Sequence, residues 1–148
     1  MKKAILGIVA LGLSILVVYT SLNSGATYAN AAGVIGPWIN DHFFFGRLSH
    51  DEVRALMGFG SKFIGHFCLF VLTGLFSYLF FVASLKRRTA RILFFVYGAF
   101  LSSLGEIIQL FIAGRSPTVV DVFVNYGGYV LLPMIHGFYR SINPRPSR

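Results

Sequence analysis

The chain is poor in charged residues. Only 12% of its 148 residues are Asp, Glu, Lys or Arg, whereas a soluble domain carries about a quarter. Hydrophobic residues make up 55% of the chain, and its mean hydropathy is +0.71. Because one small globule cannot hide this much apolar side chain from water, the composition excludes an ordinary soluble domain. It predicts a single integral membrane domain over residues 1–148.

Cysteine is almost absent. Cys68 is the only one, which excludes an intramolecular disulfide and a multi-cysteine metal site. The apolar residues around it indicate a small hydrophobic side chain that faces lipid or the core. No local motif has the spacing of metal ligands, so we expect neither a metal nor a cofactor.

Acidic residues are also scarce, with five against thirteen basic residues and a net charge of +8. Nine of the basic residues lie in three short segments at the ends of apolar runs: Lys2 and Lys3; Lys86, Arg87, Arg88 and Arg91; Arg140, Arg145 and Arg148. Such clusters are typical of the cytoplasmic ends of membrane spans, and they do not form a nucleic-acid-binding face.

Four apolar segments are long enough to cross a bilayer: residues 4–22, 63–85, 92–113 and 119–138. The sequence therefore predicts an all-α fold, an integral membrane bundle of four transmembrane helices with both termini cytoplasmic. The first segment is also open to interpretation as a signal peptide, since residues 29–31 resemble a cleavage site. Its 19-residue length favours a retained helix.

The connections follow from the same topology. Residues 86–91 form a cytoplasmic turn, 114–118 an external turn, and 139–148 a basic tail. The long external loop 23–61 becomes rich in aromatic residues, which favour the bilayer interface, so it is expected to lie on the membrane surface. Within it, the capping box Ser49–Glu52 predicts a short amphipathic helix over residues 50–58.

Seven polar residues stand in or beside the last three spans. Ionisable groups are costly in hydrocarbon, so they usually face a bundle interior or a wet cavity. All seven fall in the outer third of the membrane, with Glu106 about 10 Å below the outer end. We therefore predict one ligand-binding site, and hydrogen bonding between helices remains the structural alternative. The residues are Lys62, His66, Glu106, Gln109, Arg115, Asp121 and Asn125.

The order and spacing of these residues resembles the VanZ-like family of small bacterial membrane proteins. The matching pieces, within about 60–135, are Lys62-x-x-x-His66-Phe67, Glu106-x-x-Gln109-x-Phe111, Gly114-Arg115-Ser116 and Asp121-x-x-x-Asn125-x-x-Gly128. The resemblance implies a multi-pass protein of the bacterial cell membrane that acts on the envelope. The family is named for a protein associated with resistance to the glycopeptide teicoplanin. One departure is Gly105 just before Glu106, where looser helix packing is expected.

Three functions fit these residues. The first is a module that binds an amphiphilic envelope ligand: a lipid head group, a lipid-linked wall precursor or a lipoglycopeptide. Arg115 and Lys62 would hold its phosphate or carboxylate. The second is a membrane hydrolase or transferase with Glu106 or Asp121 and His66 as an acid/base pair, or with those three as metal ligands. The third is a structural subunit, and homo-oligomerisation is compatible with all three.

Overall fold

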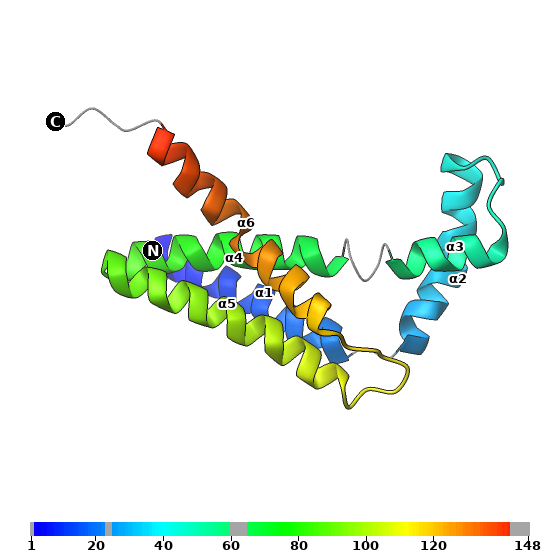
Figure 1. The fold of residues 1–148 in the computed structure, drawn as a ribbon, viewed down its shortest axis with the longest axis horizontal. Coiled ribbons are helices and arrows are strands. Elements are labelled where there is room, and N and C mark those ends of the chain that lie inside the picture. Colours follow the sequence, from blue (N-terminus) through cyan, green and yellow to red (C-terminus); the bar gives the residue numbers. More distant parts are fainter. Residues whose placement is uncertain (1, 23–24, 60–64, 143–148) are drawn as a thin grey trace.

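The computed structural model describes residues 2–22, 25–59 and 65–142, and every regular element within these ranges is a helix (Figure 1). The expected all-α fold is confirmed. Four of the helices are long and apolar enough to span a membrane: α1, α4, α5 and the Val119–Tyr139 part of α6. The elements are α1 (Lys2–Leu22), α2 (Gly25–Phe43), α3 (His50–Phe59), α4 (His66–Ser84), α5 (Arg87–Gln109) and α6 (Val119–Ile142).

The predicted turn at 86–91 is wrong. Only Leu85 and Lys86 separate α4 from α5, and the arginines of this run lie in the first turns of α5. Lysine and arginine are good helix formers, and their long side chains reach water from a helix end. A basic run therefore marks the end of a span without interrupting the helix.

The other end of α5 also differs from the prediction. The helix ends at Gln109, and the apolar residues after it belong to a turn. In that turn Phe111 is 83% exposed and Gly114 has a positive φ of 74°. Glu106 thus lies three residues, or about 4.5 Å along the axis, from the helix end instead of the predicted 10 Å.

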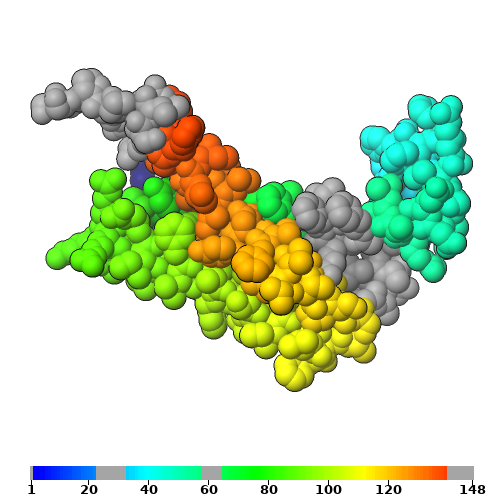
Figure 2. All heavy atoms as spheres, in the orientation of Figure 1, coloured from blue at the N-terminus to red at the C-terminus, as the bar shows by residue number. Residues whose placement is uncertain are grey.

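The span helices form an antiparallel bundle in which α4 and α5 each pack against the other three (Figure 1). Helices α1 and α6 flank this pair. The N-terminus and the end of α6 lie at one end of the bundle, together with the basic start of α5 (Figure 1). The α5–α6 turn lies at the other end, as does the hairpin of α2 and α3 (Figures 1 and 2).

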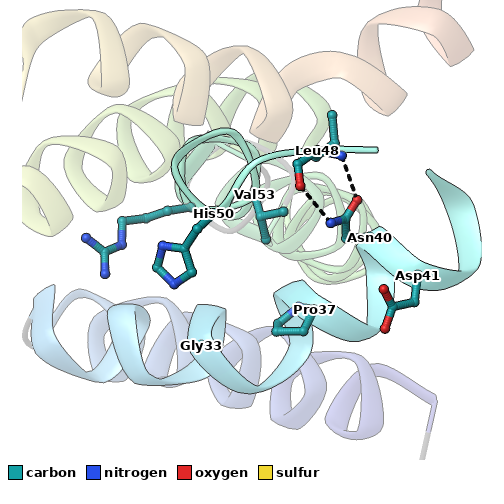
Figure 3. A pocket seen from close by; sticks show the side chains of 8 residues that line it. Gly33, Pro37, Asn40, Asp41, Leu48, His50 and Val53 are labelled. Carbon is teal, nitrogen blue, oxygen red and sulfur yellow. Dashed lines mark hydrogen bonds between the residues drawn. The ribbon is translucent and has the colours of Figure 1, made fainter. Parts of the chain in front are cut away.

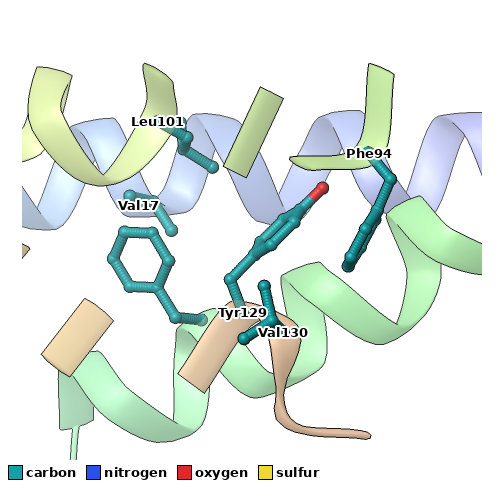
Figure 4. Packing of buried hydrophobic residues seen from close by; sticks show 6 residues of the cluster. Val17, Phe94, Leu101, Tyr129 and Val130 are labelled. Atoms are coloured by element: carbon teal, nitrogen blue, oxygen red, sulfur yellow. The ribbon is translucent and has the colours of Figure 1, made fainter. Parts of the chain in front are cut away.

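Tyr129 is the centre of the core (Figure 4). Its side chain is fully buried and stacks on Phe94 at 4.7 Å between ring centroids. Two glycines make room for this residue: a Cβ at Gly74 would overlap its main-chain carbonyl, and one at Gly98 would overlap its ring. Small residues let transmembrane helices approach closely, and here they bring α4, α5 and α6 together at one tyrosine.

A hydrogen bond also joins α5 to α1. The Tyr97 hydroxyl donates to Ser14 Oγ at 2.7 Å, and Ser14 Oγ donates in turn to the Ala10 carbonyl at 2.8 Å. Neighbouring side chains point outward, including Ile8, Leu11 and Ile15 of α1, which are all more than half exposed. An apolar outer surface around a partly polar interior is the arrangement expected of a bundle in lipid.

The expected loop 23–61 is instead a helical hairpin. The predicted helix 50–58 is confirmed as α3, but α2 was not foreseen. Asn40 joins the two parts: it donates to the Leu48 carbonyl at 2.9 Å and accepts from the Leu48 N–H at 3.1 Å (Figure 3). A cavity of about 250 Å³ lies between α2 and α3, with His50 and Asp41 among its lining residues (Figure 3).

The start of α3 is held by the predicted capping box. The Ser49 N–H donates to Glu52 Oε2 at 2.8 Å, the Ser49 hydroxyl donates to the same oxygen at 2.7 Å, and the Glu52 N–H donates back to Ser49 Oγ at 3.4 Å. The bond from the Ser49 backbone, followed by that from its hydroxyl, holds the pKa of Glu52 below its ordinary value of 4.5.

Candidate functional site

Glu106, Gln109 and Asn125 form a buried polar cluster between the end of α5 and the first half of α6. Glu106 Oε1 accepts a hydrogen bond from Gln109 Nε2 at 3.3 Å and one from Asn125 Nδ2 at 3.2 Å. The three side chains are 6%, 2% and 4% exposed, respectively. The i, i+3 spacing predicted the first bond, and the second bond connects two helices. The structure thus brings together three of the seven predicted residues in one hydrogen-bonded group.

His66 stands at the edge of this region. It is the first residue of α4 and is only 7% exposed. Gly128 lies against the neighbouring Phe67, whose carbonyl would be 3.0 Å from a Cβ at that position. Since Asn125 is three residues before Gly128 on α6, the first turn of α4 packs against α6 about one helical turn from the polar cluster.

Arg115 and Asp121 are half-buried in the connection and in the first turn of α6. Thr118 caps this helix, because its hydroxyl oxygen accepts a hydrogen bond from the Asp121 N–H at 3.1 Å. A carboxylate in the first turn also favours the positive end of the helix dipole. Asp121 therefore has a structural role at the helix start in addition to any role toward a ligand.

Gly105 does not loosen the packing beside Glu106, as its position had suggested. It is buried, and a Cβ there would lie 3.1 Å from Ser21 Oγ at the end of α1. The absent side chain lets α1 and α5 approach each other at the level of Glu106. The glycine therefore contributes to the enclosure of the polar cluster.

A groove with a volume of about 200 Å³ opens beside the cluster, between the end of α5 and the start of α6. We call it the lateral groove. Its walls are almost entirely apolar, and Glu106 is the one acidic residue that lines it. The α5–α6 connection, coloured yellow, lies at the surface at one end of the bundle (Figure 2). The lining residues are Ser103, Glu106, Ile107, Leu110, Pro117, Thr118, Val119 and Val122.

Most of this groove was not predicted from the sequence. Residues 103, 106, 107 and 110 recur at helical i, i+3, i+4 and i+7 spacing, so they share the face that carries Glu106. That spacing could have identified one wall. The predicted site residue Lys62 lies outside the described residues. Within the described ranges, no three His, Cys, Asp or Glu side chains gather as metal ligands, so His66, Glu106 and Asp121 do not form the set considered above.

Three histidines and the single cysteine lie apart from the cluster. His42, His50, His136 and Cys68 are all exposed. They are separate from the cluster in which hydrogen bonds join Glu106, Gln109 and Asn125. The role of these three residues in ligand binding stays a prediction.

Comparison with known proteins matches the chain to a protein family. The family described as VanZ/LLP1 matches residues 6–139. No curated protein and no solved structure matches the chain. The matched range extends beyond the 60–135 part that carried the sequence resemblance, because it also includes α1 and the α2–α3 hairpin.

Proposed function

This chain belongs to the VanZ/LLP1 family, and we propose that it binds an amphiphilic cell-envelope ligand at the polar cluster and the lateral groove. One observation carries the proposal: Glu106 is a member of the buried cluster and also lines the apolar groove. A polar head group would contact the cluster, and an acyl or prenyl chain would lie in the groove. Such a ligand is a lipid head group, a lipid-linked wall precursor or a lipoglycopeptide.

The cluster suits a ligand that donates hydrogen bonds. Glu106 Oε1 already accepts hydrogen bonds from two side-chain amides. Gln109 Oε1 is buried, and no group in the described part of the chain donates to it. Sugar hydroxyls and peptide N–H groups would supply this donor. Arg115, in the adjoining connection, would bind the ligand's phosphate or carboxylate through two parallel hydrogen bonds.

The charge distribution supports an outer-leaflet position for this site. The basic start of α5 and the N-terminal lysines lie at the opposite end of the bundle from the cluster. By the positive-inside rule, the basic end faces the cytoplasm and the cluster faces outward. An outward-facing pocket in a bacterial cell membrane could meet wall precursors and glycopeptides, which is the proposed link to glycopeptide resistance.

Occlusion of the groove tests the proposal. Val122→Phe would fill the lateral groove, whereas Val120→Phe adds the same volume on the exposed side of α6, where Val120 is 68% exposed. Binding of radiolabelled undecaprenyl-linked precursor to the purified protein would be measured for both. We expect the first variant to lose binding and the second to keep it. Equal binding by both variants, each folded, would contradict the proposal.

Related measurements distinguish ligand binding from a purely structural role and from catalysis. If the cluster only holds α5 to α6, Val122→Phe and Val120→Phe should differ in stability alone. If the site is catalytic, the bound precursor should be converted with time, and Glu106 with His66 would be the acid/base pair. A ligand retained unchanged supports the binding module.

A further inference from the structure

A second groove lies at the opposite end of the bundle, between α4, α5 and α6. Its volume is about 520 Å³, and the proposed function does not use it. We call it the basic groove. Its polar lining includes Arg87, Arg91 and His136, and its apolar lining includes Phe94, Phe95 and Met134. Cationic groups at one rim and aromatic rings below them give this groove an amphiphilic character.

The groove exists because α6 leaves the bundle after Pro133. Residues 134–139 are all exposed, and six consecutive residues cover every side of a helix. Figure 1 shows this last part of α6 rising away from α4 and α5. Because α6 no longer covers the start of α5, the side chain of Phe95 is 44% exposed beside the groove, whereas Phe94 is buried beneath it in the core.

The charges at this end have no acidic counterpart. The five acidic side chains of the protein are in the α2–α3 hairpin or near the α5–α6 turn: Asp41, Asp51, Glu52, Glu106 and Asp121. Arg87 and Arg91 are four residues apart, so they share one face of α5. No acidic side chain therefore competes for these arginines, and two arginines on one face match the oxygens of a phosphate from the surroundings.

We propose that the basic groove binds an anionic phospholipid of the surrounding leaflet. The phosphodiester lies between Arg87 and Arg91, and one acyl chain lies along the exposed side chains of Phe95 and Met134. Basic pockets between transmembrane helices bind such head groups. A free phosphate would satisfy the arginines but would leave the apolar floor uncovered, so the geometry favours a lipid.

Native mass spectrometry of the full-length protein in neutral detergent tests the charge requirement. Phosphatidylglycerol and phosphatidylcholine would be added in separate titrations. We expect retention of phosphatidylglycerol, weakened about fivefold by Arg91→Gln or Arg87→Gln. Arg88→Gln is the matched control, because it removes the same charge from the same turn but does not line the groove. Equal weakening by Arg88→Gln, or equal retention of the two lipids, would overturn the proposal.

Two further arms test the lipid chain and the phosphate separately. Gly137 lines the groove, and a Cβ there meets nothing within 4 Å, so Gly137→Leu should fold and should obstruct the acyl chain without any change of charge. Gly12→Leu, at an equally open position on α1, is its control. We expect only Gly137→Leu to lose phosphatidylglycerol. If glycerol phosphate displaces bound phosphatidylglycerol as well as added lipid does, the proposal is wrong. Retention of phosphatidylglycerol by both glycine variants would also contradict it.

Discussion

Asn125 on α6 donates a hydrogen bond to Glu106 on α5, across 3.2 Å and nineteen positions of sequence. Both side chains are buried, so their bond fixes the two helices at the level where the chain turns back. The same carboxyl group also reaches the lateral groove. One residue pair therefore connects the stability of the bundle with the proposed ligand site.

Removal of the donor should weaken the bundle modestly. Asn125→Ala removes the amide that α6 donates to Glu106 Oε1 and keeps that of Gln109, and a single interhelical hydrogen bond contributes about 1 kcal/mol. Thermal unfolding in detergent would measure the loss. Asn125→Asp should cost more, because it replaces the donor with a second carboxyl group. Equal stability of wild type and Asn125→Asp would show that the bond contributes little.

Gly74 and Gly98 should differ in how their alanine variants are rescued. Both substitutions overfill the core and should destabilise the fold by about 1–3 kcal/mol. The added Cβ at Gly98 meets the Tyr129 ring, whereas that at Gly74 meets the Tyr129 main chain. In a Tyr129→Ala background the penalty of Gly98→Ala should disappear and that of Gly74→Ala should remain. Unfolding curves for Tyr129→Ala, the two glycine variants and the two double variants would decide, and rescue of both would contradict the packing.

The pair of Tyr97 and Ser14 should behave as one unit. Tyr97→Phe removes the hydrogen bond between α5 and α1, at a cost of about 1 kcal/mol. Because Ser14→Ala removes the same bond, the double variant should be less destabilised than the sum of the two single variants. A double-mutant cycle by thermal unfolding measures the difference. Simple additivity would mean that the bond does not form in detergent.

The capping box of α3 should weaken in acid. Hydrogen bonds from Ser49 lower the pKa of Glu52, so the folded hairpin favours the charged carboxylate. The stabilisation is present above the ordinary value of 4.5 and is lost as the pH falls through the lowered folded pKa. The Ser49 amide signal in NMR should titrate with a midpoint below 4.5, and Glu52→Gln should abolish that titration. A midpoint at or above 4.5 would contradict the capping geometry.

The apolar runs and their basic flanks located the four spans but not their ends. Hydropathy cannot distinguish an apolar helix from an apolar turn, so Leu110–Ala113 were assigned to a helix that ends at Gln109. In α2, Gly36 and Pro37 read as turn residues. Gly36 is instead buried, and a Cβ there would overlap Val53 of α3. Its role is close helix contact, which depends on a partner distant in sequence.

In the candidate site, too, local spacing was predictable from the sequence, whereas contacts between helices were not. The i, i+3 spacing predicted that Glu106 and Gln109 share a face, and that relation depends only on helical geometry. The bond from Asn125 required the packing of α5 on α6, for which the sequence offered only agreement in depth. The position of His66 against α6 depends on Gly128, whose missing side chain allows the contact.

Lipid mass spectrometry of the purified protein tests the central claim most directly. Glu106→Gln keeps an acceptor oxygen for Gln109 and Asn125 but removes the negative charge, so the bundle should remain folded. We predict that an envelope lipid or lipid-linked precursor co-purifies with the wild type and is lost from Glu106→Gln. Phosphatidylglycerol at the basic groove should be retained by both proteins. If no other species co-purifies with the wild type, or if every other species binds equally to both proteins, a ligand site at Glu106 is contradicted.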